Sequence, residues 1–392
     1  MIGNILWLPA WYPNKLAPFD GDFIQRHARA VAIFQPVTVI YVKKDENTKY
    51  QKNIEIDISI ENNLTEIIIY YNPLKTGIRV IDRLLSQRTY KKIYRQVILK
   101  YIMENGMPPL VHVHVAWKAG IVALWLKKKF GVPYIISEHW SGYLQNTNDG
   151  VRDLYFFQRK SLESIIRNAT KITVVSHILG KAISNHFNIP DYLVIPNTID
   201  TSIFYPGKET QNDVKTFIHI SNLKYPKNIF SILKSFAEIR TEGFHFKFLI
   251  YSQASAPLEK WIKEKGMEQY VALRNEVPQV ELAEQIKLAD ALILYSKFET
   301  FGCVALEANA CGIPVIVSDI PALRENIKEG EGGIFVDLDD SNALATTLKN
   351  FIKGNHQFDK QLMAKNAADR FNFEIIGNEF SKLYKEILRS QK

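Results

Sequence analysis

The sequence predicts an α/β fold with two doubly wound parallel sheets, each in its own domain. The first observation is length: the chain has 392 residues, and a single hydrophobic core stops growing at about 250–300 residues, so two domains are expected. The second is that short apolar runs alternate with amphipathic helical segments, which is typical of parallel sheets with crossover helices. The third is that this alternation restarts after a stretch rich in Pro, Asn, Asp and Gly, residues 196–213, which we interpret as the linker.

Strands are predicted for the short apolar runs in both halves. In the first half they are residues 4–8, 37–42, 66–71, 110–113, 134–137, 171–175 and 192–195. In the second half they are residues 216–220, 246–250, 270–273, 291–295, 315–318 and 333–336. Helical patterns between them include residues 21–34, 118–130, 229–240 and 341–351. Ligands of such sheets bind outside the carboxyl ends of the strands, so site residues are sought in the loops that follow strands.

The composition is that of an ordinary globular protein. Hydrophobic residues make up 46% and charged residues 23% of the chain, which excludes disorder, collagen and coiled coil. The net charge of +8 is uneven: residues 1–200 carry 25 Lys and Arg against 16 Asp and Glu (+9), and residues 201–392 carry 24 against 25 (−1). The first half is therefore expected to meet an anionic partner, which is a nucleic acid, a phosphorylated substrate or an anionic membrane.

Cysteine content and hydropathy bear on the compartment. The two cysteines are Cys303 and Cys311, and in a helix they would lie about 12 Å apart, too far for a disulfide. Two cysteines also exclude a Cys-rich zinc site. The first residues lack the basic region of a signal peptide, and no apolar run approaches the roughly 20 residues of a membrane span. We therefore expect a cytoplasmic protein.

The basic excess of the first half is concentrated in residues 75–100. This segment contains one acid, Asp82, and its basic residues are Lys75, Arg79, Arg83, Arg88, Lys91, Lys92, Arg95 and Lys100. Apolar residues lie between them, so the pattern predicts a basic amphipathic helix or helix pair. Such a helix is either a solvated surface or a docking face for an anionic membrane. The segment contains no recognisable nucleic-acid-binding motif, and no nucleic-acid partner is expected.

The first half offers three candidate site features. Gly21 opens a predicted helix, where a glycine either lets a ligand approach backbone N–H groups or forms an ordinary turn and cap. His112 and His114 alternate with valines and so share one face of a strand. That spacing can chelate a metal, but no third ligand is evident and a structural role is favoured. His139 follows the strand of residues 134–137, at the sheet edge where ligands bind, so it is either a site residue or, as lone histidines commonly are, a structural one.

The second half carries more specific features. Asn222, Lys224 and Lys227 lie between strand 216–220 and helix 229–240. Two lysines beside a helix N-terminus form a cradle for an anion, although a solvated loop would have the same composition.

The most specific segment follows strand 291–295. Its loop holds Glu299, Phe301 and Gly302, and a helix is predicted directly after it. The backbone N–H groups at the start of that helix can hold an anionic or hydroxyl-rich ligand. Glu307 lies eight residues after Glu299, about two helical turns further along. Because its neighbours are apolar all round, the helix is expected to be buried, and a buried carboxylate needs a pair or a ligand.

This segment resembles the E-x7-E element of retaining GT-B glycosyltransferases of glycosyltransferase family 4 (glycosyl transferases group 1). The likeness extends over nearly the whole chain. Its further parts are Gly21, His112-Val113-His114, Ser137-Glu138-His139, Val175-Ser176, residues 195–200, residues 221–228, residues 310–315 and Gly333-Ile334-Phe335-Val336.

The resemblance implies a GT-B fold, in which two Rossmann-like domains face a central cleft. In that family the C-terminal helix crosses back to the first domain, and residues 372–392 have the amphipathic spacing for such a helix. The first domain would comprise residues 1–200 with 372–392 and bind the acceptor. The second would comprise residues 201–371 and bind a nucleotide-diphosphate sugar.

The resemblance also implies roles for single residues. Glu307 would hold ribose hydroxyls, and Glu299 would hold hydroxyls of the transferred sugar. Lys227 would offset the charge that develops on the leaving phosphate, and His139 would point toward the sugar. The expected catalytic residues are Glu299, His139 and Lys227, and the expected donor-binding residues are Glu307, Gly302, Phe301, Thr300, Lys224, Asn222 and Gly21.

The implied activity is that of a hexosyltransferase of class EC 2.4, which transfers a sugar with retention to a saccharide or lipid-linked acceptor. It would serve cell-envelope polysaccharide synthesis, in the cytoplasm or on the inner face of the cytoplasmic membrane. Asn222 stands where the family has an arginine; Lys224 is close enough to substitute, but lacks the bidentate guanidinium. Two alternatives stay open: a GT-B nucleotide-sugar epimerase, which would need a cluster of acids, and an inactive GT-B-like scaffold, for which Asn222 is the best argument.

No metal and no cofactor apart from the donor are expected. Asp20-Gly21-Asp22 and Asp337-Leu338-Asp339 both have a DxD form. The first match is too short to be specific, and the second precedes a predicted helix as its acidic first turn. Lysine and a helix dipole would carry the charge of the phosphates instead.

Overall fold

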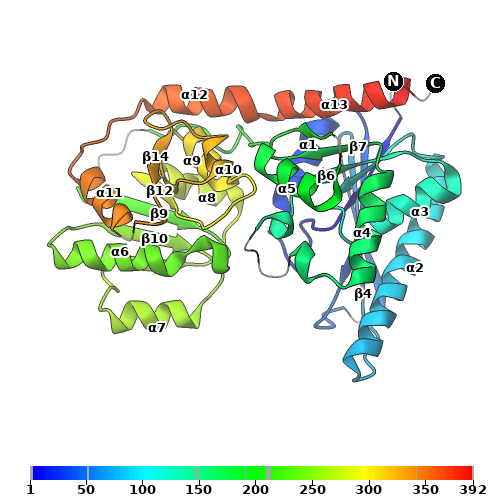
Figure 1. Cartoon of the computed structure of the whole chain (residues 1–392), viewed down its shortest axis with the longest axis horizontal. Helices are drawn as coiled ribbons and strands as arrows, with labels where there is room; N and C mark the ends of the chain where they lie inside the picture. Colours follow the sequence, from blue (N-terminus) through cyan, green and yellow to red (C-terminus); the bar gives the residue numbers. More distant parts are fainter. Residues whose placement is uncertain are drawn as a thin grey trace. The chain divides into compact units, whose positions relative to one another are not determined.

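The computed structural model describes residues 3–50, 53–145, 147, 150–189, 191–208, 213–340 and 342–390. The chain forms two compact units: unit 1 comprises Met1–Thr198 and Phe373–Lys392, and unit 2 comprises Ile199–Asn372. Figure 1 labels the helices and strands of both units. The predicted linker of residues 196–213 includes residues 209–212, which lie outside the described ranges.

Unit 1 is built on a sheet whose described strands run in the order β3-β4-β2-β1-β5-β6-β7-β8. Every neighbouring pair is parallel except β3 and β4, which are antiparallel. The strands are β1 (Ile5–Pro9), β2 (Val37–Lys44), β3 (Ile54–Glu61), β4 (Leu64–Tyr71), β5 (Val111–His114), β6 (Tyr134–Glu138), β7 (Lys171–Val174) and β8 (Leu193–Val194). The helices are α1 (Asp22–Ala32), α2 (Arg79–Asn105), α3 (Gly120–Phe130), α4 (Phe156–Asn168), α5 (His177–Phe187) and α13 (Phe373–Arg389), with short 3-10 turns η1 (Ser141–Tyr143) and η2 (Val151–Asp153).

The last helix, α13, completes the core of unit 1. Ile376, Phe380 and Tyr384 are buried with the apolar residues of β1 and α1 in one cluster, and Figure 1 shows α13 lying along α1. The two helices approach so closely at Gly377 that a Cβ there would lie 2.2 Å from the carbonyl oxygen of Ala30. Only glycine allows that approach.

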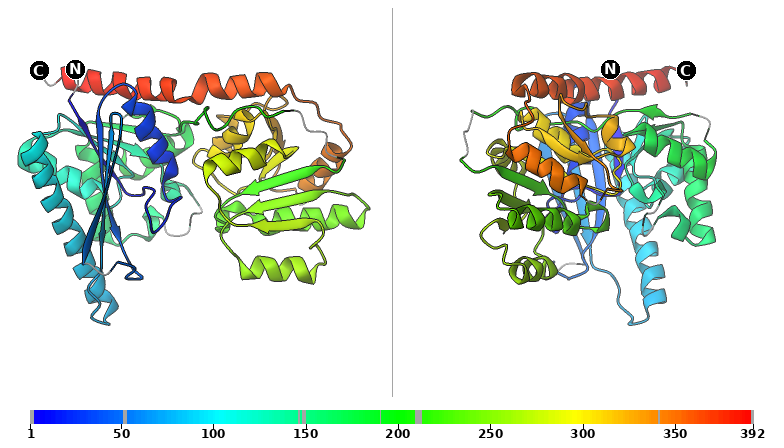
Figure 2. Two further views of the ribbon diagram at one scale, coloured as in Figure 1. Left: turned by 180° about the vertical axis from the view of Figure 1, so that it is seen from behind. Right: turned by 60° about the vertical axis from the view of Figure 1, so that its left-hand side comes forward.

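Unit 2 has a fully parallel sheet with the order β11-β10-β9-β12-β13-β14 among the described strands. Its strands are β9 (Thr216–Ile220), β10 (Lys247–Tyr251), β11 (Val271–Arg274), β12 (Ala291–Leu294), β13 (Val315–Ser318) and β14 (Gly333–Val336). Its helices are α6 (Ile229–Thr241), α7 (Ala256–Glu264), α8 (Gln279–Lys287), α9 (Cys303–Ala310), α10 (Pro321–Arg324), α11 (Ala343–Ile352) and α12 (Lys360–Phe371), with the 3-10 turn η3 (Tyr225–Lys227). Figure 2 shows helices on both faces of this sheet, as the doubly wound prediction requires.

The predicted α/β class with two parallel-sheet domains is confirmed, and most predicted elements lie within a few residues of the observed ones. The helix predicted over residues 341–351 is α11, and Ser341 itself lies outside the described residues. The basic segment 75–100 forms one long helix, α2, rather than a pair.

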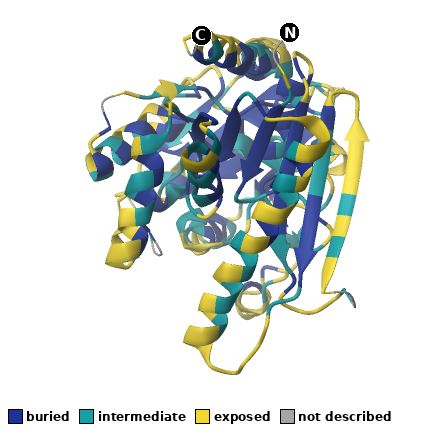
Figure 3. Ribbon diagram, turned by 90° about the vertical axis from the view of Figure 1, so that its right-hand side faces the viewer, coloured by how far each residue is buried: buried dark blue, intermediate teal, exposed yellow. Residues whose placement is uncertain are grey.

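The sequence prediction omits β3, the edge strand of unit 1. Residues 54–61 alternate isoleucine with polar residues, which is a strand signal. Ile54, Ile56, Ile58 and Ile60 are all exposed, and Figure 3 shows β3 as an exposed strand beside the largely buried β4. Among the described strands β3 pairs with β4 alone, and it faces water. It therefore falls outside the pattern of buried apolar runs by which the other strands were predicted.

Candidate functional site

Two loops of unit 2 meet at the carboxyl ends of neighbouring strands β9 and β12. Lys227 comes from the loop after β9 and Glu299 from the loop after β12, and their Nζ and Oε1 atoms are 2.6 Å apart. Ser296 donates a second hydrogen bond to the same carboxylate oxygen at 2.7 Å. The backbone N–H of Lys297 donates to the carbonyl of Pro226 at 2.7 Å, which ties the two loops together. The structure thus brings together two residues that lie 72 positions apart.

Gly302 begins α9 in the left-handed region, at φ 90°. A Cβ at this position would lie 2.5 Å from Cδ2 of Leu323, so both the conformation and the packing require glycine. The turn aims the first N–H groups of α9, which have no acceptor within the helix, out of its N-terminus near Glu299. The N-terminus therefore carries the positive end of the helix dipole beside the Lys227–Glu299 pair.

Phe301 and Glu307 are both buried. The ring of Phe301 is 1% exposed and packs edge-on against Phe371, so this residue can offer a ligand only its backbone. Glu307 is 4% exposed on α9, which agrees with the predicted burial of that helix. Glu307 and Thr300 each have a partner within the protein. The burial of Glu307 is therefore no argument for a ligand by itself, in contrast to the reasoning from sequence.

The loop after β9 is held in a tight shape by its own side chains. Leu223 has φ +55°, and its N–H donates to Oγ of Ser221 at 3.1 Å. The amide oxygen of Asn222 accepts from the backbone N–H of Lys224 at 3.2 Å. Asn222 thus closes a turn of the loop, whereas Lys224 is exposed and has no ion-pair partner within the described part of the chain.

His219 supports this loop from inside the sheet and was not predicted as a site residue. It is fully buried on β9. Its Nδ1 lies 2.8 Å from the carbonyl of Ile293 on β12, and its Nε2 lies 2.8 Å from Oγ of Ser221. Burial lowers the pKa of His219 to about 4. The residue is therefore neutral at pH 7 and links β9, β12 and the lysine-bearing loop.

In unit 1, Gly21 is the N-cap of α1 and has φ 72°. A Cβ there would lie 2.6 Å from the carbonyl carbon of Trp11. The close approach of two backbone segments therefore accounts for the glycine. Gly21 therefore forms a tight turn and the N-cap of α1, and its contact with a ligand stays a prediction.

His139 belongs to a cluster of buried histidines. Its Nε2 lies 3.3 Å from Nδ1 of His114, and the two rings stack with centroids 5.5 Å apart. His27 of α1 lies against both, with ring centroids 6.1 Å and 5.6 Å away. His112 is fully hydrogen-bonded, to the hydroxyls of Tyr384 at 2.5 Å and Ser137 at 2.7 Å. His112 and His114, the pair considered from the sequence, therefore do not act together: His112 is engaged with Tyr384 and Ser137, and the histidines grouped with His114 are His139 and His27 of α1.

Burial keeps this cluster neutral. It lowers the pKa of His27 to about 3 and holds the pKa values of His112, His114 and His139 well below the ordinary value. The Nε2 of His27 donates to the carbonyl of Pro196 at 3.1 Å. The Nδ1 atoms of His27 and His139 and the Nε2 of His114 have no hydrogen-bond partner among the described residues.

Three of these histidines also have a geometry that can hold a metal ion. One nitrogen from each of His27, His114 and His139 lies within 4.8 Å of the others, and neutral imidazole is a common ligand. Among the residues that the structure describes, these three histidines are the group of possible ligands close enough together to hold a metal ion. The expectation that the enzyme needs no metal stays a prediction.

Glu138, next to His139, organises the loops around the cluster. Its carboxylate accepts from the backbone N–H groups of Ala116, His139 and Trp140 at 2.9–3.0 Å. It also accepts from the hydroxyl of Tyr143 at 2.9 Å. Burial raises the pKa of Glu138, and these hydrogen bonds act in the opposite direction. From sequence, Glu138 stands out only as a member of the Ser137-Glu138-His139 motif, which does not predict this role.

Helix α2 carries the basic segment along the outside of unit 1. Its N-terminal end is exposed, with Val80 69% and Leu84 54% accessible, and Figure 3 shows this end as exposed. No helix in the described ranges is long and apolar enough to cross a membrane.

Comparisons with known proteins agree with this arrangement. The model of the family "Glycosyl transferases group 1" matches residues 204–386, and that of "Glycosyltransferase Family 4" matches residues 59–203. N-acetyl-alpha-D-glucosaminyl L-malate synthase of Bacillus anthracis is 25% identical over 72% of this chain and 76% of its own. D-inositol 3-phosphate glycosyltransferase of Frankia alni is 28% identical over 64% of this chain and 68% of its own.

Solved structures share the fold. Sucrose-phosphate synthase from Thermosynechococcus elongatus matches with a TM-score of 0.77 at 19% identity and covers 100% of both chains. HepE of Anabaena, solved with UDP and glucose, matches with a TM-score of 0.69 at 14% identity over 98% of this chain and 100% of that one. The two family models together span most of the chain, and its two α/β units have the fold of these enzymes. The chain is therefore a GT-B glycosyltransferase of family 4, in enzyme class EC 2.4.

Proposed function

We propose that this enzyme transfers a sugar, with retention of configuration, from a nucleotide-diphosphate sugar to a saccharide or lipid-linked acceptor. The reaction would be a cytoplasmic step of cell-envelope polysaccharide synthesis. The observation that carries the proposal is the Lys227–Glu299 pair, 2.6 Å apart beside the N-terminus of α9. A cation, a carboxylate and a helix N-terminus in one place suit a ligand that carries both phosphates and sugar hydroxyls.

In this proposal unit 2 binds the donor. Lys227 and the N-terminus of α9 face the diphosphate, and Glu299 accepts hydrogen bonds from hydroxyls of the transferred sugar. Glu307 holds the ribose through its carboxylate. Lys224, exposed and two residues from Asn222, supplies the second cation that the family places at Asn222, as a point charge without bidentate geometry. HepE, whose structure contains UDP, makes UDP-sugars the first donors to test.

Retention follows from front-face attack. The bond between C1 of the sugar and the diphosphate oxygen breaks, and the acceptor oxygen bonds to C1 on the same face. The departing phosphate oxygen takes the proton of the acceptor hydroxyl, so no protein base is needed. Lys227 and the α9 dipole stabilise the negative charge on the leaving phosphate, which is a large term in catalysis generally. His139 is neutral and contributes a hydrogen bond or its backbone carbonyl to the sugar, not a charge.

The donor half of the proposal is tested by thermal shift with UDP-, GDP- and ADP-sugars. A bound donor raises the unfolding temperature by mass action. Glu299→Ala is expected to fold normally and to lose both the donor shift and transfer, while Glu281→Ala, an exposed glutamate on α8, keeps them. Unchanged turnover in Glu299→Ala would refute the role of this residue. The anomeric configuration of the product, read by NMR, decides between retention and inversion.

We further propose that the exposed end of α2 docks on an anionic membrane. Besides its basic residues this end carries exposed Val80 and Leu84, and the guanidinium of Arg83 lies 5.8 Å from the ring of Tyr155. The neighbouring Phe156 and Phe157 are 77% and 68% exposed. Basic and apolar groups side by side suit the interface of an anionic bilayer. Flotation with phosphatidylglycerol vesicles is expected to exceed flotation with phosphatidylcholine vesicles, and equal flotation would overturn this part of the proposal.

A further inference from the structure

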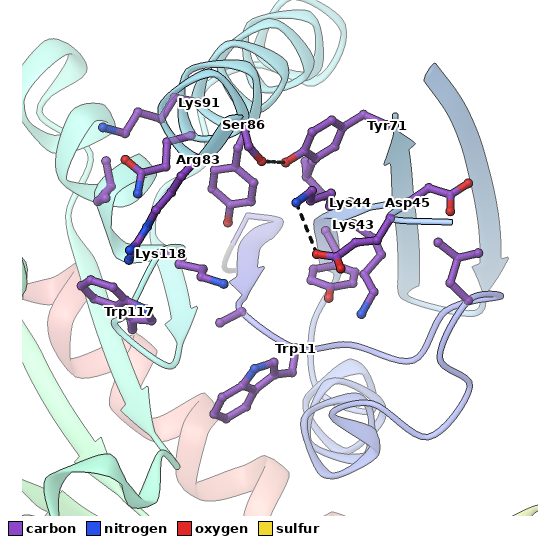
Figure 4. A pocket seen from close by; sticks show the side chains of 18 of the residues that line it. Trp11, Lys43, Lys44, Asp45, Tyr71, Arg83, Ser86, Lys91, Trp117 and Lys118 are labelled. Carbon is purple, nitrogen blue, oxygen red and sulfur yellow. Dashed lines mark hydrogen bonds and ion pairs between the residues drawn. The ribbon is translucent and has the colours of Figure 1, made fainter. Parts of the chain in front are cut away.

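Unit 1 contains a large cavity that the donor-binding residues do not share. Its volume is about 1140 Å³, and it is lined from the loop after β1, the end of β2, α2, the loop between β5 and α3, and the start of α4. Figure 4 shows side chains from these elements converging on the cavity. A cavity of this size holds a ligand as large as a phosphorylated sugar or disaccharide.

The lining is strongly basic. Seven Lys and Arg side chains line the cavity against four Asp and Glu. Lys43 is paired with Asp20 at 3.0 Å, and Lys44 with Glu46 at 3.3 Å. The remaining acids are engaged with the protein: Asp82 accepts from Thr76, and Asp45 accepts from backbone N–H groups.

Several of the cations have no counter-charge. Arg79, Arg83, Lys91 and Lys118 line the cavity and form no ion pair within the part of the chain that the structure describes. Figure 4 shows Arg83 extending from α2 toward Trp117 and Lys118. Burial, followed by the charges of Lys43 and Lys44, lowers the pKa of Lys118, and Arg83 contributes in the same direction. The ammonium of Lys118 is thus surrounded by like charges, an arrangement that favours a bound anion.

The backbone that carries Lys118 is strained. Val115 has φ 67° and Lys118 has φ 71°, and a β-branched residue with positive φ is a genuine outlier. Such strain costs about 1–3 kcal/mol per residue and persists where the surroundings over-determine it. Two hydrogen bonds hold this loop in place. The N–H of Val115 donates to the carbonyl of Ser137 at 2.9 Å, and the N–H of Ala116 donates to the carboxylate of Glu138 at 3.0 Å. The strained loop therefore fixes Lys118 and Trp117 at the cavity.

The cavity also offers groups suited to the rest of a sugar ligand. The indoles of Trp11 and Trp117 line it, and Figure 4 shows both rings beside it. Aromatic faces of this kind pack against the C–H face of a sugar or against an isoprenoid chain. The hydroxyls of Tyr71 and Ser86, which lie 3.2 Å apart, add hydrogen-bonding groups.

From these observations we infer that the cavity binds the phosphate or diphosphate group of a phosphorylated acceptor, held by Arg83 and Lys118. This inference rests on the proposed glycosyl transfer and names the chemistry of its acceptor. Arg83 provides a bidentate fork for phosphate oxygens, and Lys118 a second positive charge. The phosphate ester has two possible sources, a soluble sugar phosphate or a polyprenyl phosphate in a membrane.

The test measures binding of inorganic pyrophosphate to the full chain by calorimetry, and binding to phosphatidylcholine vesicles with and without polyprenyl phosphate. The cavity variant is R83Q/K118Q. The matched control is R88Q/K128Q, which removes the same charge from α2 and α3 at exposed positions that do not line the cavity.

The wild type and R88Q/K128Q are expected to bind pyrophosphate, and R83Q/K118Q is expected to bind it at least about tenfold more weakly. The same variant dependence with polyprenyl phosphate vesicles identifies a lipid-linked acceptor, and its absence there identifies a soluble one. No binding of either probe, or equal binding by the cavity and control variants, would overturn the inference. A thermal shift with the donor and measurable turnover in the same preparations would show that the proposed glycosyl transfer still stands, so the two failures are distinguishable.

Discussion

The two units hold their polar groups in opposite ways. In unit 2, Lys227 and Glu299 are charged, paired and still 21% and 12% exposed. In unit 1, His27, His114 and His139 are buried, and burial keeps them uncharged. Under the proposed function, unit 2 presents charged groups to a ligand, whereas the buried histidines of unit 1 make neutral contacts. Four cations of unit 1 that form no ion pair among the described residues, Arg79, Arg83, Lys91 and Lys118, line a separate cavity.

The largest effect is expected from Lys227→Met. If this lysine stabilises the leaving phosphate, kcat falls about 10²–10³-fold. The thermal stability should also fall, by about 1–3 kcal/mol, because the largely buried carboxylate of Glu299 loses its cation. Initial rates and thermal unfolding measure both quantities, and Lys263→Met, an exposed lysine of α7, is the control. A kcat within about threefold of wild type would mean that charge in unit 2 does not serve catalysis.

The next largest effect is expected from Gly21→Ala in unit 1. A Cβ at Gly21 would lie 2.6 Å from backbone atoms of Trp11, whereas one at Gly131, which also has positive φ, meets nothing within 4 Å. Gly131→Ala should cost about 1 kcal/mol of unfolding free energy, from backbone strain alone. Gly21→Ala should cost about 3 kcal/mol, because the backbone must also shift. Urea unfolding compares the two variants, and equal costs would contradict the steric argument.

Glu138→Gln tests whether a buried carboxylate orders the loops of unit 1. A glutamine cannot accept at both positions, so one or more of the four donors loses its acceptor, at a cost of about 1–3 kcal/mol. Glu163→Gln on α4 removes a carboxylate that pairs at the surface with Lys160 and Arg167, and it should cost less than about 1 kcal/mol. Denaturant unfolding gives both numbers. Similar losses of unfolding free energy in the two variants would contradict the proposal that Glu138 orders these loops.

The last prediction is a dependence of stability on pH, concentrated in unit 1 and small for each histidine. Since the folded pKa of His27 is about 3 against an ordinary 6.5, the unfolded chain binds more protons between these values. Stability therefore falls as pH drops below about 6.5, by up to about 1.4 kcal/mol per pH unit for each such histidine. Unit 1 has four of them in its cluster, and unit 2 has His219.

Hydrogen exchange at pH 7.0, 6.0 and 5.0 would locate this loss, because acid should lower protection in unit 1 before unit 2. His27→Gln is expected to reduce the pH slope. Loss of protection in unit 2 first would contradict the assignment of the acid-sensitive groups.

The fold was largely predictable because its signals are local. Buried apolar runs followed by helical patterns mark the parallel strands, and β3 was missed because it is an exposed edge strand with a different pattern. Lys227 and Glu299 could each be predicted as site residues, because each lies in a loop that follows a strand. Their ion pair depends on β9 and β12 being neighbours, which the structure shows. By contrast, His27 contacts His114 only through the packing of α1 on the sheet. The sequence near either residue has no pattern that predicts this contact. The turn formed by Asn222 and the internal partner of Glu307 likewise depend on neighbours that a sequence does not display.

The position of α13 has a consequence for the order in which the protein is made. Tyr384 hydrogen-bonds His112 across 272 residues, and α13 closes the core of unit 1. Domains generally fold as units while the chain is being synthesised. Unit 2, whose residues 199–372 are contiguous, has its whole sequence before α13 leaves the ribosome. Unit 1 is therefore the first unit whose synthesis begins and the last whose synthesis is completed. Until α13 is made, His112 lacks its hydrogen bond to the hydroxyl of Tyr384.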